Sequence, residues 1–261
     1  MENPYIHAAR TYTEKPRRDM FKLHLHENYE LFCFLKGSAQ YYVEGTVYPL
    51  KPHDILLLKV AESHALLIDK AIPYERIVIS FNGDALVGNL KERIVSFLDA
   101  RPLGQQNKYS FLKQEKENLL FYLDKICSIE DIEEKRLYLT FVLNELSKKN
   151  TSEPNQEIAD SIAEVIEYIN GHLFEDISLD MLSEKFYLSK VHLTRKFKSY
   201  VGTTIWEYIS TKRLIKAKEL LKGGKWPTDV AEACGFNDYS TFYRAYKQKY
   251  GISPKEDCVK I

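Results

Sequence analysis

The sequence predicts an α+β protein of two domains, with a β-rich barrel or sandwich in the N-terminal half and an all-α domain at the C-terminal end. Three observations predict this class. Between residues 21 and 81, short apolar runs alternate with turn residues. Beyond residue 82, the apolar spacing becomes helical. Near the C-terminus, one stretch of sequence occurs twice.

Length and composition allow two ordinary domains. The chain has 261 residues, of which 44% are hydrophobic, enough to bury two cores. No apolar run approaches the roughly 18–20 residues of a membrane span, and the N-terminus has no cationic region followed by an apolar one. We therefore expect a cytoplasmic protein with no membrane partner. The four cysteines are widely separated, which favours neither a disulfide framework nor a cysteine zinc site.

The charge is unevenly distributed along the chain. The formal net charge is zero. From residue 185 to the end, however, 16 Lys and Arg residues stand against seven Asp and Glu residues, a net charge of +9. This basic region coincides with the repeated stretch, and such a local excess is the electrostatic footprint of a nucleic-acid binder.

Five short strands are predicted in the N-terminal half. The runs are rich in Leu, Ile, Val, Tyr and Phe, and Gly, Pro and Asp punctuate the turns between them. They cover residues 29–35, 39–43, 55–58, 64–68 and 76–81. Several short strands at this spacing indicate a sandwich or barrel.

A group of histidines accompanies these strands. His24, His26 and Glu30 have the spacing His-x-His-x3-Glu, and His64 comes later. This pattern looks like the first cupin motif together with the histidine of the second, and the resemblance implies a cupin-like jelly-roll barrel over residues 1–82. Three imidazoles and a carboxylate could bind Fe, Mn, Ni or Zn, so a metal site formed by these four residues is an alternative.

The barrel is also expected to hold an effector pocket. The resemblance to cupin-like barrels also allows such histidines and the Glu to be pocket residues without catalysis. We therefore assign His24, His26, Glu30, Tyr41 and His64 to effector binding and expect no catalytic residue, no bound metal and no cofactor. Strand alternation sends about half of the nearby aromatic residues inward, and aromatic rings with a few polar groups suit a sugar.

Three helices are predicted over residues 83–148. Their apolar stripes are Leu86, Leu90, Ile94 and Leu98; then Leu112, Leu119, Leu123 and Ile126; then Ile132, Leu139, Val142, Leu143 and Leu146. Such helices could pair two subunits, or the same stripes could simply cover the barrel. Residues 149–157 are almost devoid of apolar side chains and predict a linker. A further amphipathic helix, with Ile158, Ile162, Val165, Ile169 and Leu173, opens the last domain, 158–261.

The repeat has the pattern of a helix-turn-helix unit. Each copy contains Arg, one residue, an aromatic, Lys, three residues and Gly, at Arg195 to Gly202 and at Arg244 to Gly251. In each, a helical stripe is interrupted by a short polar turn and resumes, which places the units at about 178–201 and 227–250. The second copy has one extra residue in its turn. Ser189 is the expected N-cap of one second helix, and both Gly residues are expected just beyond the helix ends.

The second helix of each unit should face DNA. The predicted contact residues are Lys190, Val191, Thr194, Arg195 and Lys198 in the first unit, and Asn237, Tyr239, Ser240, Tyr243, Arg244 and Lys247 in the second. Such side chains can donate to base edges and phosphates. Between the units, Thr204 with Glu207 predicts a capping box at the start of a helix of about 28 Å, close to the roughly 34 Å between successive major grooves.

These motifs identify a family. The segment from about 161 to 255 resembles the DNA-binding domain of the AraC/XylS family of bacterial transcription regulators. The matching residues are Gly202, Tyr208, Arg213, Leu214, Ala217, Leu220, Leu221, Val230, Ala231, Gly235, Phe236, Phe242, Arg244, Tyr246, Lys247, Gly251, Ser253 and Pro254. Pro227 and the pair Asp257-Cys258 depart from the family pattern.

The resemblance implies a transcription regulator that is not an enzyme. We expect an activator whose DNA binding is controlled by a small effector, a sugar by family analogy, with double-stranded DNA, RNA polymerase and a second copy of the chain as partners. Two rivals remain. One is a metal-binding cupin with enzymatic activity fused to a DNA-binding domain, and the other is an architectural DNA binder that responds to no ligand.

Overall fold

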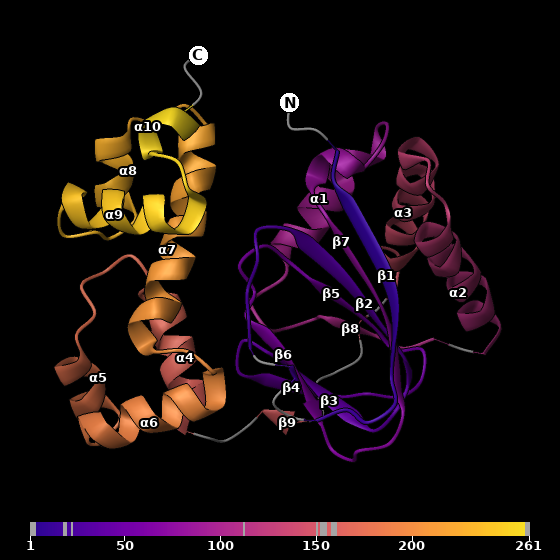
Figure 1. Cartoon of the computed structure of the whole chain (residues 1–261), viewed down its shortest axis with the longest axis horizontal. Coiled ribbons are helices and arrows are strands. Elements are labelled where there is room, and N and C mark those ends of the chain that lie inside the picture. Colours follow the sequence, from indigo (N-terminus) through magenta and orange to yellow (C-terminus); the bar gives the residue numbers. More distant parts are fainter. Residues whose placement is uncertain are drawn as a thin grey trace. The chain divides into compact units, whose positions relative to one another are not determined.

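The computed structural model describes residues 4–17, 20–21, 23–111, 113–149, 151, 156–157 and 161–258. The chain divides into two compact units, residues 1–158 and 159–261. An antiparallel β-fold with helices forms the first unit, and helices form the second, so the predicted fold class is confirmed (Figure 1). No helix in the described part of the chain is both long and apolar enough to cross a membrane.

Two sheets form the β-fold of the first unit. The strands are β1 Ile6–Thr13, β2 Tyr29–Lys36, β3 Ala39–Val43, β4 Thr46–Pro49, β5 Ile55–Leu58, β6 His64–Ile68, β7 Tyr74–Phe81, β8 Lys108–Tyr109 and β9 Gln156–Glu157. One sheet has the order β1-β7-β2-β5-β8 and the other β6-β3-β4-β9. The five predicted strands all appear, whereas β1, β4, β8 and β9 are strands that the apolar pattern did not predict.

The first unit has one core on each face of the larger sheet. Strand β2 is buried on both faces, because Phe32 and Phe34 face the other sheet while Leu31 and Cys33 face the helices. The inter-sheet core is largely aromatic and includes Tyr41, and a second core lies under the helices. Because alternate residues of one strand point to opposite faces, this two-sided burial explains why β2 is an almost continuous apolar run.

Three helices cover the outer face of the larger sheet (Figure 1). They are α1 Leu90–Ala100, α2 Lys113–Ser128 and α3 Ile132–Leu146. Leu86 is buried but precedes α1 instead of belonging to it, because a 3-10 turn at Gly83–Ala85 separates β7 from the helix. Leu112 of the predicted second stripe, Ile158, and residues 150 and 152–155 of the predicted linker lie outside the described residues, while the last two linker residues pair with β4 as β9.

The second unit contains two helix-turn-helix units joined by one helix. Its helices are α4 Ser161–Gly171, α5 Leu179–Lys185, α6 Lys190–Val201, α7 Ile205–Lys222, α8 Pro227–Ala233, α9 Tyr239–Tyr250 and α10 Pro254–Asp257. The pair α5 and α6 lies at one end of α7, and α8 and α9 lie at the other (Figure 1). Four residues separate α5 from α6 and five separate α8 from α9, so the extra turn residue of the second copy is confirmed.

Local sequence signals set the helix ends in this unit. Ser189 accepts a hydrogen bond from His192 N, and Gly202 ends α6 with φ 81°. Thr204 and Glu207 form the predicted capping box of α7. The departure at Asp257-Cys258 is accommodated by new contacts: Tyr246 donates to Asp257 Oδ2 at 2.5 Å, and Cys258 Sγ lies 3.4 Å from Lys225 O.

Candidate DNA interface and effector site

Helices α6 and α9 each bury one face and expose the other. Leu193, Phe197 and Val201 anchor α6, and Phe242 and Tyr246 anchor α9. The predicted DNA contacts occupy the remaining faces. Lys190, Val191, Arg195, Lys198, Asn237, Tyr239, Ser240, Arg244 and Lys247 are exposed, and Thr194 and Tyr243 are half-buried. All eleven side chains are therefore at least partly accessible, ten of them on the two helices and Asn237 in the turn before α9.

Some of these side chains already have contacts within the chain. Lys190 forms an ion pair with Asp180 at the start of α5. Arg244 Nε donates to Ser240 O at 3.3 Å within α9. A DNA phosphate at Lys190 would therefore have to compete with the Asp180 carboxylate, which weakens the net contribution of that lysine to DNA binding.

One exposed side chain near α6 was not predicted. Tyr187, in the turn before α6, is 95% exposed and has φ 52°. In the second unit the matching turn position is Gly235, with φ 75°. The sequence repeat aligns these two residues, but it does not show that a tyrosine occupies the left-handed conformation.

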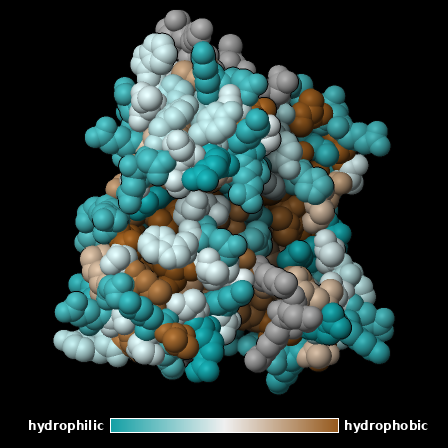
Figure 2. Space-filling view, turned by 60° about the vertical axis from the view of Figure 1, so that its left-hand side comes forward, coloured by the Kyte–Doolittle hydropathy of each residue, from teal (hydrophilic) through white to brown (hydrophobic). Residues whose placement is uncertain are grey.

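Figure 2 shows that hydrophilic side chains form most of one face of the molecule, with hydrophobic side chains in separate patches.

Helix α7 positions the two helix-turn-helix units. Its Tyr208 ring packs edge-on against Phe197 of α6, with ring centroids 5.7 Å apart. Leu214, Ala217 and Leu221 pack against α8 and α9. Eighteen residues give α7 a length of about 27 Å, and burial of both ends makes it a rigid spacer.

In the first unit, the structure brings all five predicted effector residues together. Glu30 is 7% exposed, and its Oε2 accepts from His26 Nε2 at 3.1 Å while Oε1 accepts from Tyr41 OH at 3.3 Å. His64 Nε2 lies 3.9 Å from Glu30 Oε1. The rings of His24 and His64 are 4.3 Å apart, and backbone hydrogen bonds join these two residues.

Protonation of this cluster follows from its partners. Burial lowers the pKa of His26, but the hydrogen bond and charge of Glu30 outweigh it, so the pKa is raised. Burial raises the pKa of Glu30, whereas His26 and the neighbouring imidazoles bring it down to about 2. Burial lowers the pKa of His64 to about 3. The cluster therefore combines an ionised Glu30 beside His26, whose pKa is raised, with a neutral His64.

The neutral His64 presents an unused acceptor. Its Nδ1 donates to Glu62 O at 2.8 Å, so its Nε2 carries the lone pair. That Nε2 is buried and has no hydrogen-bond partner in the described part of the chain. A buried acceptor left unpaired is destabilising, and a ligand hydroxyl would satisfy it.

The same residues can also be compared with the geometry of a metal site. One nitrogen each from His24, His26 and His64 lies within 4.8 Å of the others, whereas neighbouring ligands on tetrahedral zinc stand about 3.4 Å apart. His26 and His64 each donate Nδ1 to a backbone carbonyl, as metal-binding histidines do. The three imidazoles could hold a divalent ion after modest closure, with Glu30 as fourth ligand, and the ion would replace the His26 proton that balances the carboxylate.

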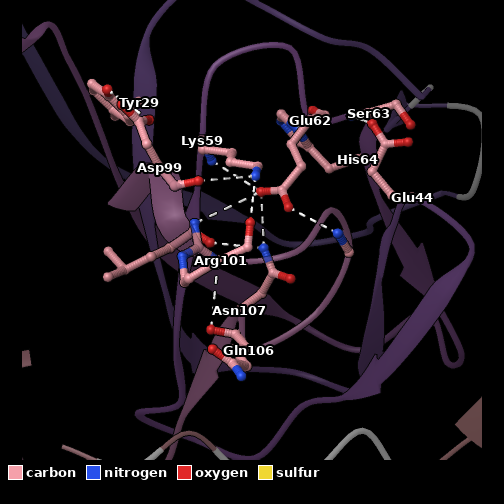
Figure 3. A network of polar contacts seen from close by, with 12 residues as sticks. Tyr29, Glu44, Lys59, Glu62, Ser63, His64, Asp99, Arg101, Gln106 and Asn107 are labelled. Atoms are coloured by element: carbon pink, nitrogen blue, oxygen red, sulfur yellow. Dashed lines mark hydrogen bonds and ion pairs between the residues drawn. The ribbon is translucent and has the colours of Figure 1, made fainter. Parts of the chain in front are cut away.

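A buried polar network lies next to His64, one member of the cluster (Figure 3). Glu62, two residues before His64, is fully buried. It accepts hydrogen bonds from Lys59 N, Gly104 N and Asn107 Nδ2, each at 2.9 Å. Burial raises the pKa of Glu62, while the charge of Arg101 and the backbone donors lower it, and the net pKa is raised. The network fixes the turn that carries His64.

Comparisons with known proteins match each unit of the chain to a domain family. Residues 8–111 match the family described as AraC-like ligand binding domain, and residues 182–257 match the one described as Helix-turn-helix domain. The chain is 25% identical over 250 residues to an uncharacterized HTH-type transcriptional regulator, YbfI, of Bacillus subtilis, covering 91% of this chain and 86% of that protein. It is 25% identical over 251 residues to the HTH-type transcriptional activator RhaS of Mannheimia succiniciproducens, covering 92% and 90%.

Similar solved structures were also found. ToxT from Vibrio cholerae is 16% identical with a TM-score of 0.40, over 96% of this chain and 97% of that one. The DNA-binding domain of AdpA in complex with a target DNA is 27% identical with a TM-score of 0.36, over 38% of this chain and 89% of that one.

Proposed function

Since this chain belongs to the AraC family of transcription regulators and has both a ligand-binding and a helix-turn-helix domain, we propose that α6 and α9 read two successive major grooves of one operator. An effector in the β-fold of the first unit controls this binding. It does so by shifting a dimer between arrangements that place the DNA-binding units differently on their half-sites.

The observation that carries the DNA proposal is the pair of exposed, N-capped helices at the two ends of α7. Each presents a short arginine-containing face, and the spacer of about 27 Å approaches the roughly 34 Å repeat of the major groove. The net charge of +9 beyond residue 184 favours a polyanionic partner. Arg195 and Arg244 are the candidates for bidentate guanine contacts, and the lysines suit phosphates.

Replacing Arg195 or Arg244 with alanine is expected to weaken operator binding by about 1–3 kcal/mol each, a roughly 5- to 150-fold rise in Kd. The loss should be greatest at one or two base positions, because a bidentate contact reads one base pair. Fluorescence anisotropy with a promoter fragment selected by the wild-type protein, and with its single-base variants, measures both the loss and its position dependence.

The matched control is Lys148→Ala, which removes one exposed positive charge just after α3 in the first unit. This variant should bind the operator as the wild type does. An equal loss for Lys148→Ala and Arg195→Ala would mean that net charge alone drives binding. A loss that is uniform over all base positions would assign the arginines to phosphates.

A sugar is the effector class that we propose for the first unit. The unpaired Nε2 of His64 and the Glu30 carboxylate can bind hydroxyl groups, and the Tyr41 ring offers an apolar face. The name of the RhaS relative, a transcriptional activator, supports activation as the output, with RNA polymerase as the further partner that activation requires.

We also propose that α2 and α3 pair two copies of the chain. One face of this helix pair packs on the sheet, while Phe121, Leu137 and Phe141 on the other are 56%, 60% and 43% exposed. The ring centroid of Tyr122 lies 5.4 Å from that of Phe121 and 4.8 Å from that of Phe141, so Phe121 and Phe141 belong to one aromatic patch, and Leu137 lies one helical turn before Phe141. A contiguous apolar patch of this kind marks an interaction surface.

Leu137→Glu should convert the dimer to a monomer, because pairing would bury an uncompensated charge. Sedimentation velocity on the full chain measures the change. Leu67→Glu, at an exposed apolar residue of β6 that is 39% exposed, is the control and should leave the dimer intact. A Leu137→Glu variant that sediments as the wild type does would remove α2 and α3 from the interface.

A further inference from the structure

The register of β2 with β7 defines which side chains line the space between the two sheets. Glu30 pairs with Ser80, Phe32 with Val78 and Phe34 with Arg76. Phe32 and Phe34 belong to the inter-sheet core, as does Tyr74. Since paired residues of neighbouring strands point to the same face, Arg76 and Ser80 also face the interior.

Part of this inner face is open to solvent. Phe32 and Phe34 are fully buried, whereas Arg76, Val78 and Ser80 on the neighbouring strand are only half-buried. The next strand, β1, places Ala9 opposite Val78 and Thr11 opposite Arg76. Ala, Thr and Ser are short side chains, so this part of the inner face is not covered by bulky groups of its own strands. We call it the β1–β7 strip.

Arg76 is the cation of the β1–β7 strip, and it lacks an anion. Its guanidinium carbon lies 5.2 Å from the centre of the Phe21 ring and 5.9 Å from that of Tyr74. Its Nε is buried without a hydrogen-bond partner, and no carboxylate among the described residues pairs with it. On the outer face of the same two strands, Arg10 binds both Glu75 and Asp124 at 2.8 Å.

The chemistry of this site selects a carboxylate. A guanidinium presents parallel N–H donors that match the two oxygens of a carboxylate, and the flanking rings hold its plane. The inner faces of β1, β2 and β7, strands that the structure describes throughout, carry no other Lys or Arg. A single positive charge, with the Glu30 carboxylate on the same face, suits a monoanion better than a phosphate dianion.

We propose that Arg76 binds the carboxylate of the effector, which is therefore a small hydroxylated carboxylic acid, such as a sugar acid, and not a neutral sugar. The rest of the ligand lies along the β1–β7 strip, where Thr11 and Ser80 supply hydroxyl groups and Glu30 closes the far end. This assignment rests on the proposed function of the first unit as an effector-binding domain, and it replaces the neutral sugar with its acid.

The first test needs no ligand. Arg76→Met in the full-length protein keeps the contacts to Phe21 and Tyr74 and removes the unpaired donor. Without added ligand, its melting temperature should equal or exceed that of the wild type. A melting temperature several degrees lower would show that the guanidinium holds the fold together, and this result would overturn the proposal.

The second test uses matched acids and neutral sugars. Millimolar D-galacturonate or D-gluconate should raise the melting temperature of the wild type by several degrees, whereas galactose and glucose should not. Arg76→Met should lose this response, and Arg93→Met, at an exposed arginine of α1, should keep it. The proposal is overturned if neither acid stabilises the wild type, if neutral sugars act equally, or if Arg76→Met responds as the wild type does.

Operator binding measured on the same samples separates a failure of the carboxylate site from a failure of effector control. Stabilisation by an acid that depends on Arg76 supports the carboxylate site even when operator affinity does not change, and the effector-control part of the proposed function then fails alone. Stabilisation by a neutral sugar that changes operator affinity in both the wild type and Arg76→Met retains effector control and rejects the carboxylate site.

Discussion

Arg213→Ala is expected to lower the free energy of unfolding of the DNA-binding unit by about 3–5 kcal/mol. Arg213 of α7 is 9% exposed. Its Nε donates to Leu173 O and its NH2 to Glu175 O, both at 2.7 Å, and its NH1 donates to Gly235 O at 2.5 Å. One guanidinium thus ties the loop before α5 and the turn between α8 and α9 to the connecting helix.

The expected effect is large because three carbonyl groups lose a charged donor together. Each buried carbonyl left unpaired is destabilising by about 1–3 kcal/mol. Gly235 also approaches this loop closely, since a Cβ added at Gly235 would lie 2.5 Å from Phe174 O. Lysine cannot substitute, because one ammonium cannot reach three carbonyls placed around a planar fork.

Urea unfolding followed by far-UV circular dichroism measures the loss, and operator binding by the second helix-turn-helix unit should decrease with it. Lys216→Ala on the same helix is the control. Lys216 pairs with Glu219 at 2.8 Å, but the two side chains are 40% and 68% exposed, so the change should be below about 1 kcal/mol. Equal losses for the two variants would contradict the structural role assigned to Arg213.

Sequence patterns were sufficient to predict those parts of the structure that depend on residues close together in the chain. The turns and ends of α6, α7 and α9 depend on caps a few residues away, so Ser189, Gly202 and the Thr204–Glu207 box could be recognised directly. The duplication added independent support, because the same pattern defines both helix-turn-helix units. His24, His26, Glu30 and His64 could likewise be grouped, since their motif spacing resembles one that recurs in barrels.

Sequence patterns failed where structure depends on distant pairing. Strand β1 has mixed composition and becomes a strand by pairing along its whole length with β7. In the sequence, nothing distinguishes Arg76 from other strand residues. Only its register with Phe34 places it on the inner face, where it has no counter-ion among the described residues. Glu62 and Arg101 are far apart in the chain, and no spacing rule pairs them.

Glu62→Ala should lower the free energy of unfolding of the first unit by about 3–5 kcal/mol, because it leaves buried Arg101 without its counter-charge. Arg101 is 4% exposed, and its NH2 lies 3.9 Å from Glu62 Oε2. Gly104 N would lose its acceptor, and Asn107 Nδ2 would lose one of its two acceptors (Figure 3). Because the Glu62 side chain fixes the turn whose main-chain carbonyl accepts from His64 Nδ1, the variant should also bind the effector more weakly.

Differential scanning calorimetry on the full chain measures the loss of stability, and a control at an exposed ion pair separates it from general surface electrostatics. Glu133→Ala is the matched control, since Glu133 pairs with Arg136 at 2.7 Å but is 64% exposed, and the expected loss is below about 1 kcal/mol. The double variant Glu62→Ala with Arg101→Ala should lose less than the sum of the two single variants, because it removes the orphaned charge. If the two losses were additive, the ion pair would have no part in holding the His64 turn, and the three neutral donors would carry the whole effect.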